Sequence, residues 1–159
     1  TDAPAVDPRV QPWICWKHGV ELWFYWESTH WQHNHQGPRA RQDQNVWADP
    51  VTFAGGNAEV NGDGTLFYPG EDAKFPEQDR GVPGPVSSIR MKNLRRGQQD
   101  VAYLELAKAL GREAEARAIV NRLIPRAFSD AKPDQDASWP QTGDPWDAAR
   151  RELSRLFAK

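Results

Sequence analysis

Residues 19–31, which read G-V-E-L-W-F-Y-W-E-S-T-H-W, decide the fold that the sequence predicts. From Val20 to Trp26 the run is β-branched, aromatic and aliphatic with a single charge, as in strands that are buried on both faces. Gly19 marks its start, and polar and aromatic residues follow its end. Because ligands bind at the carboxyl ends of such strands in α/β folds, we expect the mouth of a site there. A core strand followed by an ordinary loop is the alternative.

Tryptophan is unusually frequent, with eight among 159 residues and five of these within the first 31. Indole rings fill protein cores and also stack on flat apolar faces, such as the C–H face of a sugar ring. We expect three of them, Trp13, Trp16 and Trp23, to belong to the core. The tryptophans that we assign to a ligand are Trp26, Trp31 and Trp47.

Composition argues against several classes of partner. The net charge of −2, the pI near 6.1 and the mixed charges do not fit a nucleic-acid partner. Mean hydropathy is −0.80, and no apolar run approaches the ~18 residues that a membrane span needs. Cys15 is the only cysteine, so no intramolecular disulfide can form. The chain begins at Thr1 without a signal-peptide pattern, and we expect a processed chain or a piece of a longer one.

The first half of the chain predicts one helix, one buried strand and a long loop. Asp7 and Pro8 are typical of a helix start, and Gly19 is typical of a helix end. The strand at residues 20–26 follows at once, so helix and strand form half of an α/β repeat. Residues 27–61 lack periodicity, which predicts an ordered loop over the mouth of the site.

A turn and a short strand are expected after this loop. The dipeptides Asn-Gly and Asp-Gly at residues 61–64 are strong turn signals. Residues 65–68 are then expected to form a short apolar strand, which Pro69-Gly70 ends.

The second half predicts helices. Ser87 or Ser88 is expected to cap a helix that Gly97 interrupts. Two further helices are expected at residues 98–110 and 112–124, each with an apolar stripe.

A linker is expected at residues 128–143, with Trp139 as its anchor. The last helix is expected from Asp144-Pro145 onward, and an ion pair between Asp147 and Arg151 on its solvated face.

Three histidines, His30, His33 and His35, form the pattern H-x-x-H-x-H. Imidazoles this close can share a transition metal, but no cysteine accompanies them and no helix fixes their geometry. A polar loop is the favoured interpretation, and we expect neither a metal nor another cofactor.

Two sequence blocks resemble a known family. Residues 12–31 read P-W-I-C-W-K-H-G-V-E-L-W-F-Y-W-E-S-T-H-W. Residues 61–70 read N-G-D-G-T-L-F-Y-P-G, and residues 84–104 read G-P-V-S-S-I-R-M-K-N-L-R-R-G-Q-Q-D-V-A-Y-L. In this order the blocks resemble the C-terminal part of the catalytic domain of glycoside hydrolase family 123 and its uncharacterised bacterial relatives. The match runs from about residue 2 to residue 110.

The resemblance implies the C-terminal portion of a (β/α)8 barrel of the TIM type, with about two strands and four or five helices. A barrel takes ~200 residues or more, so an upstream segment or a separate chain would have to complete it. Residues 1–127 would be the barrel part, residues 128–143 a linker, and residues 144–159 a helix packed on the barrel. The family also suggests a periplasmic or secreted location.

Characterised relatives are β-N-acetylgalactosaminidases that use an adjacent Asp-Glu pair. This chain contains no Asp-Glu dipeptide, and Glu71-Asp72 has the reverse order, so no catalytic residue is carried over. The family's helical signature is matched by Arg90, Arg95 or Arg96, Gly97, Asp100 and Tyr103. Arg96 and Asp100 are spaced to form a simple ion pair on the helix.

The main hypothesis is the aromatic substrate-binding wall of a glycoside hydrolase that acts on glycans, including N-acetylhexosamine-containing ones. The expected substrate-binding residues are Tyr25, Trp26, Glu27, His30, Trp31, Asp63 and Tyr68. The alternative is a non-catalytic carbohydrate-binding or structural subunit of a larger extracellular assembly. A metal-binding module at the histidines is the weakest hypothesis.

Overall fold

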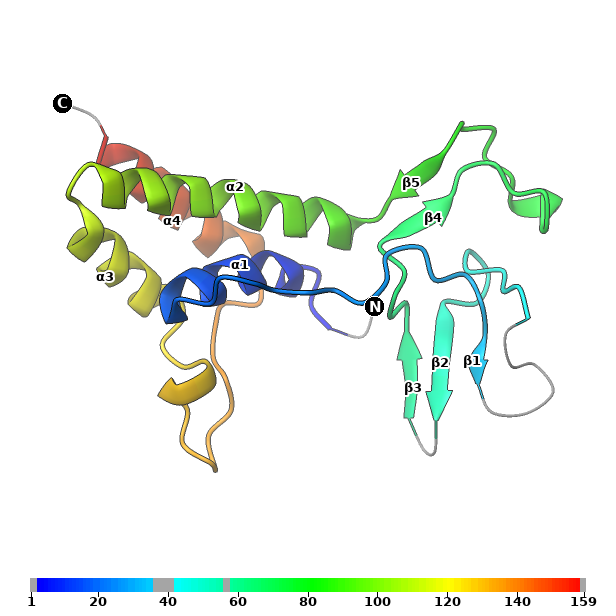
Figure 1. Cartoon of the computed structure of the whole chain (residues 1–159), viewed down its shortest axis with the longest axis horizontal. Coiled ribbons are helices and arrows are strands. Elements are labelled where there is room, and N and C mark those ends of the chain that lie inside the picture. The colour runs from blue at the N-terminus through cyan, green and yellow to red at the C-terminus, as the bar shows by residue number, and fades with distance from the viewer. Residues whose placement is uncertain (1–2, 36–41, 56–57, 158–159) are drawn as a thin grey trace. The chain divides into compact units, whose positions relative to one another are not determined.

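The computed structural model describes residues 3–35, 42–55 and 58–157, and the chain folds into two compact units (Figure 1). The first unit combines Thr1–Ala5 with Phe24–Lys92, and the second combines Val6–Trp23 with Asn93–Lys159. Strands and loops make up most of the first unit, whereas the second is helical. Each unit is therefore described by itself.

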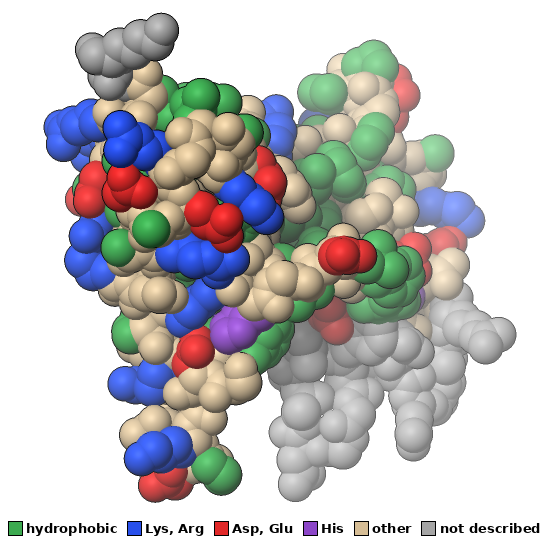
Figure 2. All heavy atoms as spheres, turned by 60° about the vertical axis from the view of Figure 1, so that its left-hand side comes forward, with side chains coloured by type: hydrophobic (Ala, Val, Ile, Leu, Met, Phe, Trp, Pro, Cys, Tyr) green, Lys and Arg blue, Asp and Glu red, His purple; other side chains and the backbone are tan. Residues whose placement is uncertain are grey.

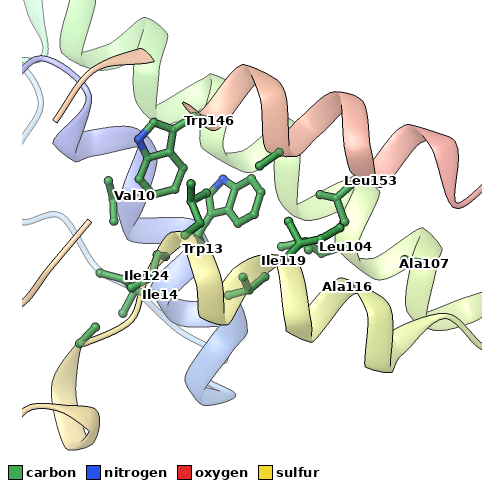
Figure 3. Close-up of a cluster of buried hydrophobic side chains, with 14 of the residues drawn as sticks. Val10, Trp13, Ile14, Leu104, Ala107, Ala116, Ile119, Ile124, Trp146 and Leu153 are labelled. Carbon is green, nitrogen blue, oxygen red and sulfur yellow. The ribbon is translucent and has the colours of Figure 1, made fainter. Parts of the chain in front are cut away.

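Four helices build the second unit, with a short 3₁₀ helix, η2 (Phe128–Asp130), in the connection before the last one. They are α1 (Asp7–His18), α2 (Ile89–Ala109), whose first residues belong to the other unit, α3 (Glu113–Leu123) and α4 (Gly143–Arg155). Their apolar faces enclose one core, which includes Val10, Leu104, Ile119 and Leu153 (Figure 3).

Two tryptophans form the centre of this core. Trp13 and Trp146 are fully buried, and their rings meet edge-to-face with centroids 5.5 Å apart. Such pairs stabilise by about 0.5–1.5 kcal/mol beyond their buried area. The expectation that Trp13 is a core residue is confirmed, whereas Trp23 is 39% exposed and does not belong to the core.

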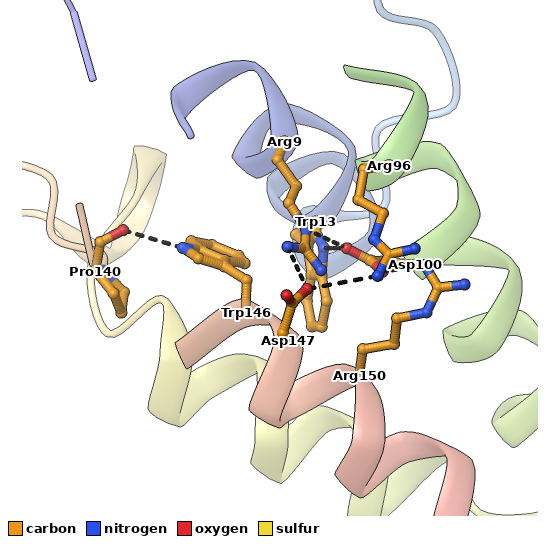
Figure 4. Close-up of polar contacts among 8 residues, drawn as sticks. All are labelled: Arg9, Trp13, Arg96, Asp100, Pro140, Trp146, Asp147 and Arg150. Carbon is orange, nitrogen blue, oxygen red and sulfur yellow. Dashed lines mark hydrogen bonds and ion pairs between the residues drawn. The ribbon is translucent and has the colours of Figure 1, made fainter. Parts of the chain in front are cut away.

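A buried ion network lies beside the tryptophan pair (Figure 4). The Asp100 carboxylate on α2 is fully buried and accepts hydrogen bonds from Arg9 Nε at 2.7 Å and Trp13 Nε1 at 3.1 Å, both on α1. Arg150 Nη1 on α4 donates to the other carboxylate oxygen at 2.9 Å. The expected helical pair of Asp100 with Arg96 is wrong, because Asp100 faces inward toward two other helices.

Asp147 also departs from its expected partner. It pairs with Arg9 Nη1 at 2.8 Å and with Arg96 Nη2 at 3.6 Å, rather than with Arg151 on its own helix. The expectation of a merely solvated face is therefore wrong here, because this side of α4 faces α1 and α2.

Gly97 does not interrupt the helix, contrary to the sequence-based expectation. α2 runs unbroken through it, and Gly97 is buried where α1 crosses. A Cβ on Gly97 would lie 2.4 Å from the carbonyl oxygen of Arg9. Glycine is present because the two helix backbones approach closely, and not because the helix ends.

The other helix expectations are largely confirmed. α1, α3 and α4 occupy the expected segments, and Gly19 ends α1 in the left-handed conformation with φ of 66°. Asp7 does not cap α1; its carboxylate accepts a hydrogen bond from Trp139 Nε1 at 2.9 Å, which explains how Trp139 anchors its segment. No helix in the described ranges is both long and apolar enough to cross a bilayer.

Two small sheets organise the first unit. One holds β1 (Asn34–His35), β2 (Val51–Gly55) and β3 (Ala58–Asn61), with β1 parallel and β3 antiparallel to β2. The other pairs β4 (Phe67–Pro69) with β5 (Pro85–Ser87), and the 3₁₀ helix η1 (Pro76–Gln78) lies between them in the chain. The stretch expected to be loop, residues 27–61, therefore supplies three strands.

The predicted fold class is wrong. Residues 20–26 form no strand; Leu22 is 82% exposed and Phe24 is 77% exposed. The only parallel pairing among the described strands is the two-residue β1–β2 match, so no part of a (β/α)8 barrel is present there. A strand buried on both faces needs a paired neighbour and covering helices, whereas residues 20–26 are irregular and mostly exposed.

The contact at Gly97 gives a stability prediction. Gly97→Ala should destabilise the protein by about 1–3 kcal/mol, because the overpacking cost exceeds the ~1 kcal/mol that alanine gains in helix propensity. Chemical denaturation monitored by tryptophan fluorescence measures the difference. Gly143→Ala is the matched control, because a Cβ there meets nothing within 4 Å and the glycine is also helical. Equal stability of the two variants would contradict the close approach.

Candidate functional site

A tight turn at residues 62–64 lies at the centre of the candidate site. Gly62 and Gly64 have φ of 68° and 69°, which confirms the turn that the Asn-Gly and Asp-Gly dipeptides predict. Asp63 lies between them, and its carbonyl accepts a hydrogen bond from Thr52 Oγ1 at 2.8 Å. We call Tyr25, Trp26, Glu27, His30, Asp63 and Gly64 together the turn site.

Arg90 holds this turn from the first turn of α2. Its guanidinium donates to the carbonyl oxygens of Gly62 and Thr65. Ser88 caps the helix, since its hydroxyl accepts from the Met91 N–H at 3.2 Å, which confirms one of the two expected caps. A Cβ on Gly62 would lie 2.5 Å from Arg90 Nη1, so glycine is needed for the guanidinium to approach.

Residues 28–30 run alongside the chain that leaves the turn. The His30 N–H donates to the Gly64 carbonyl at 2.8 Å, and Thr65 Oγ1 donates to the His30 carbonyl at 2.7 Å. An antiparallel bridge joins Thr29 to Thr65, and the Ser28 carbonyl accepts two further N–H groups. These bonds fix the segment that carries the predicted site residues against the turn.

Trp26 and His30 pack directly on Gly64. Their ring centroids are 5.2 Å apart, and a Cβ on Gly64 would lie 2.9 Å from Trp26 Cζ2 and 2.8 Å from His30 Cβ. His30 Nδ1 lies 3.3 Å from the Glu27 carboxylate. Trp26 is nevertheless 45% exposed, so part of this residue faces solvent near the Glu27 carboxylate.

Tyr25 completes the turn site as a fixed hydroxyl. Its oxygen accepts a hydrogen bond from the Gly64 N–H at 3.1 Å and lies 3.5 Å from Asp63 Oδ1. Burial raises the pKa of Tyr25, and the neighbouring Asp63 carboxylate adds to this rise. The phenol therefore stays protonated at neutral pH and can donate to the carboxylate.

Five of the seven predicted substrate-binding residues meet at the turn site, whereas two lie elsewhere. Trp31 Nε1 donates to the Phe67 carbonyl at 2.9 Å. Tyr68 packs on Trp47 with ring centroids 4.6 Å apart, and both line a separate hollow of about 330 Å³. Trp31 thus supports β4, and Tyr68 belongs to a second aromatic surface.

The histidine pattern gains no support as a metal site from the described side chains. They include no group of three or more His, Cys, Asp or Glu residues that could hold a metal ion. His30 is directed to Glu27, and the His33 main-chain N–H donates to the Gln42 carbonyl at 2.9 Å. The side chain of His35 lies outside the described part.

Sequence reasoning missed the role of Arg90 and of the two glycines. Arg90 stands in the S-I-R motif and the glycines in the G-D-G motif, and the structure joins these two sequence blocks through one guanidinium. The only sequence signal was that both motifs occur in the same chain. Their occurrence does not indicate that Arg90 contacts the turn.

No model of a known protein family matches this chain, and no curated protein matches its sequence. The resemblance to glycoside hydrolase family 123 therefore depends on the quoted sequence blocks alone.

Crowding at Gly64 gives a prediction for the turn site. Gly64→Ala should destabilise the protein by the ~1–2 kcal/mol of a left-handed alanine plus about 1–3 kcal/mol of overpacking, and should shift the fluorescence of Trp26. Gly84→Ala is the matched control, because Gly84 has φ of 79° but open space around its Cβ position. Chemical denaturation of both variants separates the cost of the left-handed backbone from the cost of overpacking. Equal losses would show that Trp26 and His30 do not pack on Gly64.

Proposed function

We propose that the turn site binds a saccharide, as the substrate-binding part of a glycoside hydrolase. The observation that carries this proposal is the exposed ring of Trp26, held by Gly64 and His30 beside the Glu27 carboxylate. An indole face stacks on the C–H face of a pyranose, while carboxylates accept hydrogen bonds from its hydroxyls. Asp63 offers a second carboxylate, and Tyr25 keeps it in place.

The sugar class follows from the family resemblance. Characterised relatives cleave β-linked N-acetylgalactosamine, so we propose an N-acetylhexosamine as the saccharide. Rigid placement of the ring favours binding, because the site loses little conformational entropy when the sugar docks.

Catalysis is assigned to residues outside this sequence. Glycoside hydrolysis needs two carboxyl groups, or one together with a substrate acetamide, at a fixed separation. No Asp-Glu dipeptide occurs here, and the reversed pair does not replace it. Asp72 of that pair is buried and accepts the N–H groups of Lys74 and Phe75 at 3.0 and 2.9 Å, so it serves a local turn.

A partner segment is the second part of the proposal. We infer that the polypeptide carrying the catalytic carboxylates also pairs with residues 20–23. These residues are β-prone and exposed, with Leu22 at 82%, and they border a hollow of about 550 Å³ in the helical unit. An extended chain that pairs with this segment would form main-chain hydrogen bonds and bury its apolar side chains, as in strand addition.

Trp26→Ala should weaken saccharide binding by about tenfold or more, because the stacking face is lost. Titration with N-acetylgalactosamine and with galactose, followed by calorimetry, measures the loss and the preference for the acetamide. Trp23→Ala is the matched control, since Trp23 is 39% exposed but lies in the other unit. Trp146→Ala should instead lower stability by about 3–5 kcal/mol. Equal loss of binding in Trp26→Ala and Trp23→Ala would reject the turn site.

The chain by itself should bind the sugar without hydrolysing it. Incubation with an aryl β-N-acetylgalactosaminide should release no phenol, because the catalytic pair is missing. Turnover that Glu27→Gln abolishes would place catalysis in the turn site. Binding that persists without hydrolysis in the complete assembly would favour the non-catalytic carbohydrate-binding alternative.

A further inference from the structure

α2 and α4 bring several arginines to one hollow of the helical unit. The spacing of residues 96 and 103 places them on one face of α2, and residues 147, 150, 151 and 154 share one face of α4. The hollow measures about 230 Å³. It is lined by Arg96, Tyr103, Asp147, Arg150, Arg151 and Ser154.

Positive charge exceeds negative charge in this hollow. Three arginines line it against one carboxylate, Asp147, and that carboxylate already pairs with Arg9 at 2.8 Å. Burial alone would raise the pKa of Asp147, but Arg9 and then Arg96 hold that pKa below its usual value, so it stays ionised. Arg151 forms no ion pair with any residue that the structure describes. Figure 2 shows basic and acidic side chains intermingled over the visible face of the molecule.

Arg150 is held in one orientation before any ligand arrives. Its Nη1 donates a hydrogen bond to Asp100 Oδ1 at 2.9 Å, and the Tyr103 ring centroid lies 4.6 Å from its guanidinium carbon (Figure 4 shows Arg150 beside Asp100). The side chain is 18% exposed, so only part of the guanidinium is open to a ligand. Arg9, which does not line the hollow, pairs with both Asp100 and Asp147 and adds positive charge behind it.

We propose that this hollow binds a small tetrahedral oxyanion, a phosphate or sulfate group that is free or part of an ester. Arg96, Arg150 and Arg151 approach from two helices and suit a tetrahedral group, whose oxygens point in several directions. A planar carboxylate offers two oxygens, which one bidentate guanidinium already satisfies. Tyr103 and Ser154 supply hydroxyl groups at the rim.

Calorimetric titration with inorganic phosphate, and separately with sulfate, at constant ionic strength tests the proposal. We expect saturable binding of one or both anions, with the tighter one identifying the ester class. The double variant Arg96→Gln, Arg151→Gln should bind about tenfold more weakly or worse, because two charge-assisted donors are lost. Neither residue belongs to the buried Asp100 contacts, so the fold should persist.

The matched control carries the same charge change on the same helices. Arg95→Gln with Arg155→Gln removes two exposed arginines that do not line the hollow. This control should bind phosphate or sulfate as the parent chain does. No saturable binding of either anion, or equal weakening in both double variants, would overturn the proposal, since the second result reports only the overall charge.

Discussion

The buried carboxylate of Asp100 is the interaction on which the helical unit depends. It joins α2 to α1 through Arg9 and Trp13, and to α4 through Arg150. Breaking a buried pair costs about 3–5 kcal/mol, whereas an exposed pair such as Glu113 with Arg117 contributes about 0–1 kcal/mol. The network also fixes the orientation of Arg150. The same hydrogen bond to Asp100 that stabilises the helical unit therefore shapes the arginine-lined hollow.

Arg90 has the corresponding role in the first unit. Its guanidinium donates hydrogen bonds to two carbonyl groups of the turn, those of Gly62 and Thr65. Leaving buried carbonyls without donors costs about 1–3 kcal/mol each, so the clamp determines whether the turn holds its shape. Because Trp26 and His30 pack on Gly64 of this same turn, Arg90 indirectly positions the aromatic face of the site.

Short sequence patterns predicted the helix ends and the turn correctly. Pro8 and Gly19 marked the ends of α1, and glycine dipeptides marked the turn, because helix ends and turns depend on a few adjacent residues. The prediction that Gly97 interrupts the helix was wrong. Glycine is needed there because of the nearby Arg9 carbonyl, 88 positions earlier in the chain. The predicted partner of Asp100 was wrong for the same reason. Helical spacing favoured Arg96, but Asp100 is buried and pairs with Arg9 and Arg150 on two other helices. Five predicted site residues met at one turn, but nothing local indicated that Arg90 would hold it.

Residues 20–26 show why composition alone does not make a strand. Preference for the β conformation records how well a side chain fits a half-buried pleated surface, so it is realised only when a neighbouring strand supplies that surface. Residues 20–26 form no strand in the structure, and Leu22 and Phe24 remain exposed. Burying side chains of this size stabilises by about 1.5–3 kcal/mol each. A further polypeptide segment that buried Leu22 would therefore gain free energy of this size, which is why the proposed partner is placed at residues 20–23.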